Sequence, residues 1–290
     1  MLYRNSATQE ELDAQYNLRA LIPEAATQYE DFCARESVKL RDELDHLLDV
    51  PFGPTLAEHV DVYPAPEPPA GGSPVLVYVH GGFWVLRTSK EFGFVSRGPA
   101  SRGVATVVTN YALAPAVTIG EMVRQTRAAV AWAYRNAASF GGDPERLHVA
   151  GHSAGGHLVA MLLMTDWEGE YGLPKDTVKS VTAISGLYDL SPFPYTFLQP
   201  KLGLTADEVL QYSPILHVPD EAPPLLLPYG AKETDGFRQQ SEDFHSAWKA
   251  KGLDGTLLPI SGKNHFDILY GFLDAKSPLL ASILERMEGG

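Results

Sequence analysis

Hydrophobic residues follow two different patterns along the chain. Over residues 8–48 they recur at roughly helical intervals, and Thr8 with Glu11 has the spacing of a capping box. We therefore expect a helical N-terminal segment, residues 1–50, that caps the rest of the molecule. The Pro-rich stretch at 63–74 cannot continue a helix or a central strand, so it is expected to be a surface connection.

From residue 74 onward, short apolar runs alternate with helical patterns. The runs expected to be strands are 74–80, 105–109, 147–151, 178–186, 223–229 and 255–260. The stretches expected to be helices are 121–139, 157–164, 236–251 and 278–287. Strands that are covered on both faces carry continuous apolar runs, and alternating strands and helices form parallel sheets. We predict an α/β fold with a mostly parallel central sheet flanked by helices, in one domain over residues 1–290.

Composition and charge exclude several classes of partner. The 290 residues include 36 acidic and 23 basic ones, for a net charge of −13, which disfavours binding to nucleic acid or to anionic membranes. No apolar run approaches the ~20 residues of a membrane span, and the first residues lack the apolar stretch of a secretory signal. Cys33 is the single cysteine, which is typical of a reducing compartment. We expect a cytoplasmic protein that acts on a small molecule, and the sequence leaves a homodimer open.

A candidate nucleophile lies at the end of one expected strand. Ligands bind outside the carboxyl ends of the strands in parallel sheets, so the residues that follow each strand matter most. The strand at 147–151 runs into Gly151-His152-Ser153-Ala154-Gly155, a G-x-S-x-G motif, and a helical pattern follows. This order of strand, motif and helix is typical of a nucleophile elbow, in which glycines permit a sharp turn. Ser153 is therefore the expected nucleophile.

A second glycine motif follows the strand at 74–80. It reads His80-Gly81-Gly82-Phe83-Trp84 and lies before the G-x-S-x-G motif, where the oxyanion loop of such enzymes is found. Glycine permits a close approach of the backbone to a substrate, so that N–H groups can face a developing negative charge. The expected oxyanion hole is built from Gly81, Gly82, Phe83 and Ala154.

A hydroxyl nucleophile needs a base, and the base is expected after the last strand. Of the nine histidines, His265 occupies that place. His152 and His157 flank Ser153 and are too local to serve as the base, so they are expected to pack against or support the site. His80 belongs to the glycine motif, and the remaining five are expected in the N-terminal region, at a strand start or on the surface: His46, His59, His148, His217 and His245.

The acid that orients the base is expected after the strand at 223–229. Glu233 and Asp235 both lie there, and spacing alone does not decide between them. Asp189, which follows another strand, is a third candidate. The chain order of serine, acid and histidine is that of the α/β-hydrolase fold.

Taken together, these motifs resemble those of the kynurenine formamidases, or arylformamidases, which lie close to the hormone-sensitive-lipase-like esterases. The similar segments are LDAQYN, HGGFW, GHSAGGHL, GAKETDGFRQQS and NHFDIL. Members often have a carboxylate four residues before the Phe of the F-x-x-Q-S segment. Here that Phe is Phe237, so the resemblance favours Glu233 as the acid. The chain differs from the common family pattern at Phe83, at residues 88–91 and at Asn264.

The resemblance implies a serine hydrolase that cleaves a small acyl group, such as formyl, from an aryl amide through an acyl-enzyme. A carboxylesterase for small acyl esters and a non-catalytic ligand-binding protein are the alternatives. No cofactor is implied, and a single cysteine without an H-E-x-x-H pattern leaves little for a zinc site. Aromatic residues are expected to line the pocket, although several of them are equally typical of a core: Phe83, Trp84, Phe92, Phe94, Tyr195 and Phe197.

Overall fold

A central eight-stranded sheet organises the computed structural model, which describes residues 2–288. The strand order is β1-β2-β4-β3-β5-β6-β7-β8. The strands are β1 (Leu47–Pro51), β2 (His59–Tyr63), β3 (Ser73–Val79), β4 (Ala105–Thr109), β5 (Gly142–His152), β6 (Val181–Ile184), β7 (Leu225–Gly230) and β8 (Gly255–Ile260). From β4 to β8 the neighbours are parallel, whereas β2 pairs antiparallel with β4 and with β1. The predicted mostly parallel sheet is confirmed.

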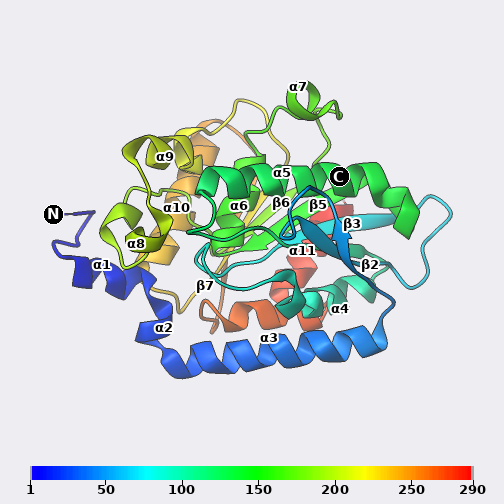
Figure 1. Ribbon diagram of the computed structural model, residues 1–290, viewed down its shortest axis with the longest axis horizontal. Helices are drawn as coiled ribbons and strands as arrows, with labels where there is room; N and C mark the ends of the chain where they lie inside the picture. Colours follow the sequence, from blue (N-terminus) through cyan, green and yellow to red (C-terminus); the bar gives the residue numbers. More distant parts are fainter. Residues whose placement is uncertain (1, 289–290) are drawn as a thin grey trace.

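Helices cover both faces of this sheet. Eight α-helices come after β3 in the chain: α4 (Arg97–Ala100), α5 (Ile119–Asn136), α6 (Ala154–Leu162), α7 (Trp167–Tyr171), α8 (Gln199–Leu202), α9 (Ala206–Gln211), α10 (Asp235–Ala250) and α11 (Pro278–Glu288). In Figure 1, α5 and α6 lie above the sheet, and α4 and α11 lie below it. Strands β4 and β7 are buried along their whole length because side chains on both faces are covered. This burial explains their continuous apolar sequences.

The N-terminal segment, expected to be helical over residues 8–48, is helical up to Glu43. It forms three helices, α1 (Gln9–Tyr16), α2 (Leu18–Leu21) and α3 (Pro23–Glu43). The predicted capping box of α1 is confirmed. The pyrrolidine ring of Pro23 disfavours a helical conformation at Ile22, so α2 ends at Leu21 and α3 starts anew.

The strands β1 and β2 were not expected, and β1 occupies the end of the segment predicted to be helical. Val50 of β1 pairs with Val60 of β2 at the antiparallel edge of the sheet. The side chains of β1 are mostly exposed, so its sequence lacks the continuous apolar run that marked the central strands. An edge strand of five residues therefore has no strong hydrophobic pattern to reveal it.

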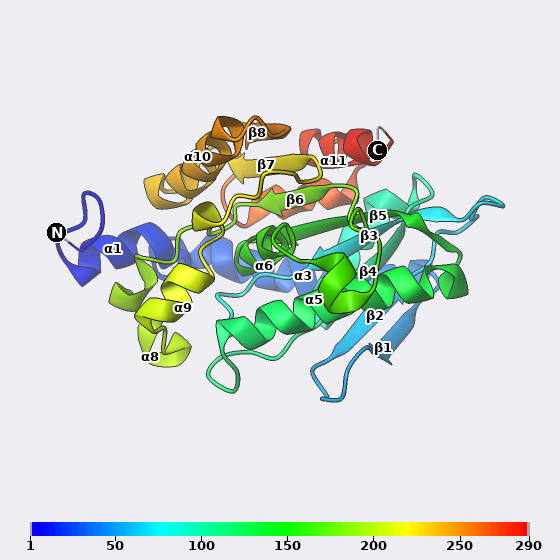
Figure 2. The same ribbon diagram turned by 90° about the horizontal axis from the view of Figure 1, so that it is seen from above.

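The cap lies along the molecule and is tied to later segments. In Figure 1, α3 runs beneath the sheet, and α1 and α2 lie at the end of the molecule that holds the N-terminus. Figure 2 shows that the arrowheads of β6 and β7 point toward this same end. Thr234 Oγ1 donates to the carbonyl of Gln15 at 2.7 Å, and the Phe197 N–H donates to Asp13 Oδ1 at 2.8 Å. The cap is thus held over the carboxyl end of the sheet.

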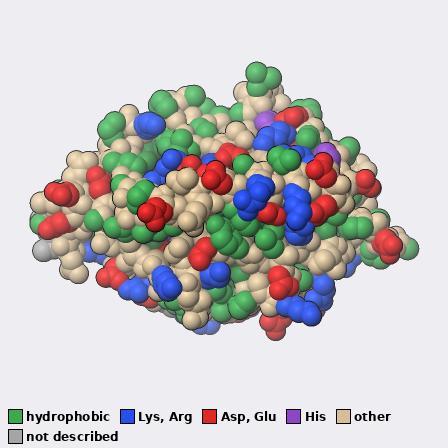
Figure 3. Space-filling view, turned by 90° about the horizontal axis from the view of Figure 1, so that it is seen from below, with side chains coloured by type: hydrophobic (Ala, Val, Ile, Leu, Met, Phe, Trp, Pro, Cys, Tyr) green, Lys and Arg blue, Asp and Glu red, His purple; other side chains and the backbone are tan. Residues whose placement is uncertain are grey.

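Charged side chains help to hold α3 in place. Figure 3 looks onto the face that α3 covers and shows acidic and basic side chains interleaved there. Arg97 of α4 pairs with Glu43 of α3 at 2.5 Å. Cys33, also on α3, is fully buried, and burial raises the pKa of its thiol to about 12. Cys33 is therefore a packing residue, held as the protonated thiol.

Within residues 2–288, no helix has both the length and the apolar character that crossing a membrane requires.

We expect Gly155→Ala to lower the free energy of unfolding by at least about 2 kcal/mol, because overpacking against rigid atoms is destabilising. A Cβ at Gly155 would lie 2.0 Å from the carbonyl oxygen of Val79, which is backbone and cannot move aside. Urea denaturation measures the change. Gly71→Ala is the matched control, since a Cβ there meets no atom within 4 Å. Equal stability of the two variants would contradict this account of the packing between α6 and β3.

Candidate active site

Ser153 lies at a sharp turn between β5 and α6. Its backbone angles are φ 58° and ψ −119°, a region that side-chain-bearing residues rarely adopt. Two hydrogen bonds hold the turn: the Ser153 N–H donates to Ile184 O at 2.9 Å, and the His157 N–H donates to Ser153 O at 3.0 Å. Such strain persists only where the surroundings impose it, and it is concentrated at functional sites. The turn has the conformation expected of a nucleophile elbow.

A buried histidine–carboxylate pair lies on the loops after β7 and β8. His265 Nδ1 is 3.1 Å from Glu233 Oε2. The other carboxylate oxygen of Glu233 accepts from Ser185 Oγ at 2.6 Å and from the Gly230 N–H at 2.7 Å. Both side chains are almost inaccessible to solvent. A buried carboxylate with partners on both oxygens is fixed in orientation, and it fixes the imidazole in turn.

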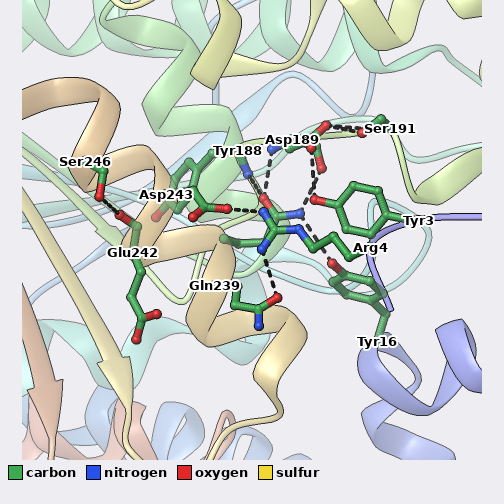
Figure 4. Close-up of polar contacts among 11 residues, drawn as sticks. Tyr3, Arg4, Tyr16, Tyr188, Asp189, Ser191, Gln239, Glu242, Asp243 and Ser246 are labelled. Atoms are coloured by element: carbon green, nitrogen blue, oxygen red, sulfur yellow. Dashed lines mark hydrogen bonds and ion pairs between the residues drawn. The ribbon is translucent and has the colours of Figure 1, made fainter. Parts of the chain in front are cut away.

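The other two candidate acids have different partners. Asp235 is largely exposed in the first turn of α10, where it pairs with Arg238. Asp189 Oδ2 accepts from Tyr3 Oη at 2.9 Å, and its Oδ1 accepts from Ser191 (Figure 4). Figure 4 also shows Arg4 reaching Gln239 and Asp243. Asp189 and its neighbours therefore anchor the N-terminus, and the structure brings Glu233 to His265.

Ser153 and His265 line one cavity with about 440 Å³ of empty space, part of it open to solvent. The other lining residues come from the loop after β3, from the neighbours of Ser153 and His265, and from the cap: Arg19, Tyr29, Glu30, Gly81, Gly82, Phe83, Leu86, Arg87, Phe92, His152 and Phe266. Among the residues described, no hydrogen bond joins the Ser153 hydroxyl to His265. Catalytic hydrogen bonds are often long in unliganded sites and tighten when substrate binds.

The loop after β3 presents free backbone donors to this cavity. Gly82 has a φ of 132°, and a Cβ there would lie 2.2 Å from Leu86 O, so glycine is required. The Gly82 carbonyl accepts from the N–H groups of Val85 and Leu86. Within residues 2–288, the N–H groups of Gly82, Phe83 and Ala154 donate to no protein acceptor. Unpaired donors beside a nucleophile are what an oxyanion hole requires.

The aromatic lining differs in part from the expectation. Phe83 and Phe92 border the cavity, as expected. Trp84 does not: it is fully buried, and its N–H donates to His157 Nδ1 at 3.2 Å. Phe94 is also buried and packs edge-on against Phe32 of α3. The prediction for Trp84 and Phe94 was wrong because their rings are used to fill the core between the loop and its neighbours.

The other two expected aromatic residues also lie outside the cavity lining. Tyr195 is half exposed, and Phe197 packs edge-on against Phe83 with ring centroids 5.7 Å apart. The sequence reasoning missed six lining residues: Arg19, Tyr29, Glu30, Leu86, Arg87 and Phe266. Phe266 was signalled by its position beside His265. The three cap residues carried no signal, since helical spacing does not tell which faces of α2 and α3 meet the rest of the molecule.

The histidines beside Ser153 are buried and uncharged. His152 Nε2 lies 2.9 Å from the backbone oxygen of His265, and burial holds the pKa of His152 well below its usual value. His157 Nε2 lies 2.8 Å from Tyr212 O, and burial lowers the pKa of His157 to about 4. Neutral imidazoles can donate one hydrogen bond each to these carbonyls. They support neighbouring backbone, as the sequence predicted.

Comparison with known proteins decides the family. The BD-FAE family model matches residues 60–248. A kynurenine formamidase of Danio rerio is 31% identical over 256 residues, which cover 87% of this chain and 85% of that protein. The chain belongs to the kynurenine formamidase family.

Solved structures agree on the fold of this family member. A structure from Silicibacter sp. tm1040 is 29% identical and has a TM-score of 0.82, covering 94% of this chain and 99% of that one. EstE1, a thermophilic carboxylesterase from a metagenomic library, has the same fold, with a TM-score of 0.73 at 21% identity over 91% of this chain and 95% of that one. This kynurenine formamidase family member is a serine hydrolase of the α/β-hydrolase fold that acts on small acyl groups.

We predict that Glu233→Gln lowers kcat by a factor on the order of 10⁴, the loss seen when the carboxylate of a serine protease triad is replaced by an amide. The amide would present the wrong partner to His265 Nδ1. Asp235→Asn is the control, and it leaves kcat unchanged because Asp235 is exposed and pairs with Arg238. Steady-state kinetics with one ester substrate measures both. A fully active Glu233→Gln enzyme would contradict the prediction that Glu233 is the acid that orients His265.

Proposed function

We propose that the chain is an arylformamidase whose catalytic triad is Ser153, His265 and Glu233. The observation that carries the proposal is the buried pair of His265 Nδ1 and Glu233 Oε2, 3.1 Å apart, at the cavity that Ser153 also lines. A carboxylate on Nδ1 sets the tautomer of the imidazole, so that Nε2 is left as the base. The 31% sequence identity to a kynurenine formamidase supports hydrolysis of an aryl formamide as the reaction.

The reaction is acyl transfer in two halves. His265 removes the proton of Ser153, whose oxygen attacks the carbonyl carbon of the amide. The N–H groups of Gly82, Phe83 and Ala154 bind the resulting oxyanion, and each such donor is typically worth about 3–4 kcal/mol in the transition state. His265 then protonates the departing aryl amine. Water, activated by the same imidazole, releases the acid and regenerates Ser153.

The cavity favours an aromatic leaving group. The rings of Phe83, Phe92, Tyr29 and Phe266 border it, and aromatic rings pack well in offset or edge-on contact with one another. A formyl group is the smallest acyl group and therefore requires the least space beside Ser153. The absence of any organic cofactor and the cytoplasmic location stay predictions, and the sequence leaves a homodimer open.

The runner-up is a carboxylesterase for small esters, favoured by the fold shared with a carboxylesterase. The triad serves esters and amides alike, so kinetics must separate the two. We expect a higher kcat/KM for N-formylkynurenine than for p-nitrophenyl acetate, because only the former combines an aryl amine leaving group with formyl, the smallest acyl group. A preference for the ester by orders of magnitude would favour the runner-up.

Active-site labelling tests the nucleophile independently of the substrate. A fluorophosphonate probe is expected to label the wild type, and Ser153→Ala is expected to abolish labelling and to lower kcat by a factor on the order of 10⁵–10⁶. Ser246→Ala is the control, since Ser246 lies on the exposed face of α10 and donates to Glu242 O. Absence of labelling in the wild type would favour a non-catalytic ligand-binding protein.

A further inference from the structure

The last turn of α1 lies against the start of α10, directly after Glu233 in the chain, and Figure 1 shows both helices at the same end of the molecule. Gln15 makes two hydrogen bonds there. Its Oε1 accepts from the Gly236 N–H at 3.0 Å, and its carbonyl accepts from Thr234 Oγ1 at 2.7 Å. A Cβ at Gly236 would lie 2.9 Å from Gln15 Cβ, so the two segments meet with no room for a side chain between them.

Helix α10 takes its N-terminal cap from another element. The first N–H groups of a helix have no acceptor within the helix, and the side chain of the N-cap residue usually supplies one. Here the N-cap residue is Thr234, whose side chain caps no N–H of α10 and donates to α1 instead. The carboxamide of Gln15 accepts from the second residue of α10 in its place. The start of α10 is therefore fixed by the N-terminal cap of the molecule.

The next residue of α1, Tyr16, reaches the expected base through one aromatic ring. The rings of Tyr16 and Phe237 meet edge-on with centroids 5.7 Å apart, and the ring of Phe237 lies 4.3 Å from that of His265. All three side chains are buried. Two adjacent residues of α1 thus support the two partners of the histidine–carboxylate pair: Gln15 holds the chain beside Glu233, and Tyr16 backs the ring that packs on His265.

We propose that Gln15 is a positioning residue of the reaction, which holds the start of α10 so that the carboxylate of Glu233 stays within hydrogen-bond distance of His265. This inference rests on the proposed triad and extends it, because it makes the N-terminal cap part of the support of the acid. Glu233 Oε2 lies 3.1 Å from His265 Nδ1, so a small shift breaks the contact. A misplacement of about 1 Å in a catalytic group can cost about 100-fold in rate.

The test starts with Gln15→Met, which keeps the length of the side chain and removes the acceptor. We expect kcat for p-nitrophenyl acetate to fall by about 10- to 100-fold. KM is expected to stay near its wild-type value, because Gln15 does not line the cavity. Gln15→Glu keeps an oxygen at the same reach, at a helix N-terminus that favours negative charge, and is expected to restore most of the rate. Gln9→Met is the matched control, an exposed glutamine on the same helix, and it leaves kcat unchanged.

A double-mutant cycle then separates positioning of Glu233 from a general structural role. The readout is the rate at which the fluorophosphonate probe labels Ser153, which depends on no particular substrate. If Gln15 acts through Glu233, Gln15→Met slows labelling of the otherwise wild-type protein but changes it by no more than about twofold in the Glu233→Gln background.

Equal slowing in both backgrounds, or a folded Gln15→Met protein with wild-type kcat, would overturn the positioning role and leave the triad intact. A Glu233→Gln protein that labels as fast as the wild type would overturn the triad itself. Circular dichroism checks that each variant is folded. Gln15→Asn withdraws the same acceptor by one methylene, and it takes the place of Gln15→Met in the cycle if that variant does not fold.

Discussion

The left-handed turn at Ser153 is the constraint on which the rest of the site depends. It requires α6 to start directly after β5 and to lie so close to β3 that no side chain fits at residue 155. Because β3 is held there, the loop that follows it begins beside the serine, and its residues Gly81, Gly82 and Phe83 line the same cavity as Ser153. The loops after β7 and β8 reach this point because parallel strands end at one edge of the sheet.

Much of this arrangement was predictable from the sequence because it depends on local chain geometry. Continuous apolar strands identify the sheet, and glycines at 81, 82, 151 and 155 mark places where backbone must turn or approach closely. Spacing alone could not choose between Glu233 and Asp235. The choice depends on which carboxylate is buried, and Glu233 is, because Ser185 and the Gly230 N–H satisfy its second oxygen.

The parts that could not be predicted depend on packing between distant segments. The helical pattern of residues 8–48 does not reveal that Pro23 restarts the helix or that the chain continues into an edge strand. Trp84 directly follows Phe83, and Phe94 lies further along the chain after the same strand, yet both rings fill the core. Whether a ring faces a cavity or the interior depends on the φ angles of the loop and on its neighbours, including α3.

The distribution of the cavity wall along the chain has a consequence for biosynthesis. Arg19, Tyr29 and Glu30 are translated long before His265 and Phe266, which line the same cavity. The Tyr3–Asp189 hydrogen bond likewise joins residues 186 positions apart. A nascent chain therefore carries the cap residues of the cavity wall long before His265 is made, and the cavity is incomplete until then. Non-local contacts of this kind also slow folding, so the emerging cap must wait for the sheet that it covers.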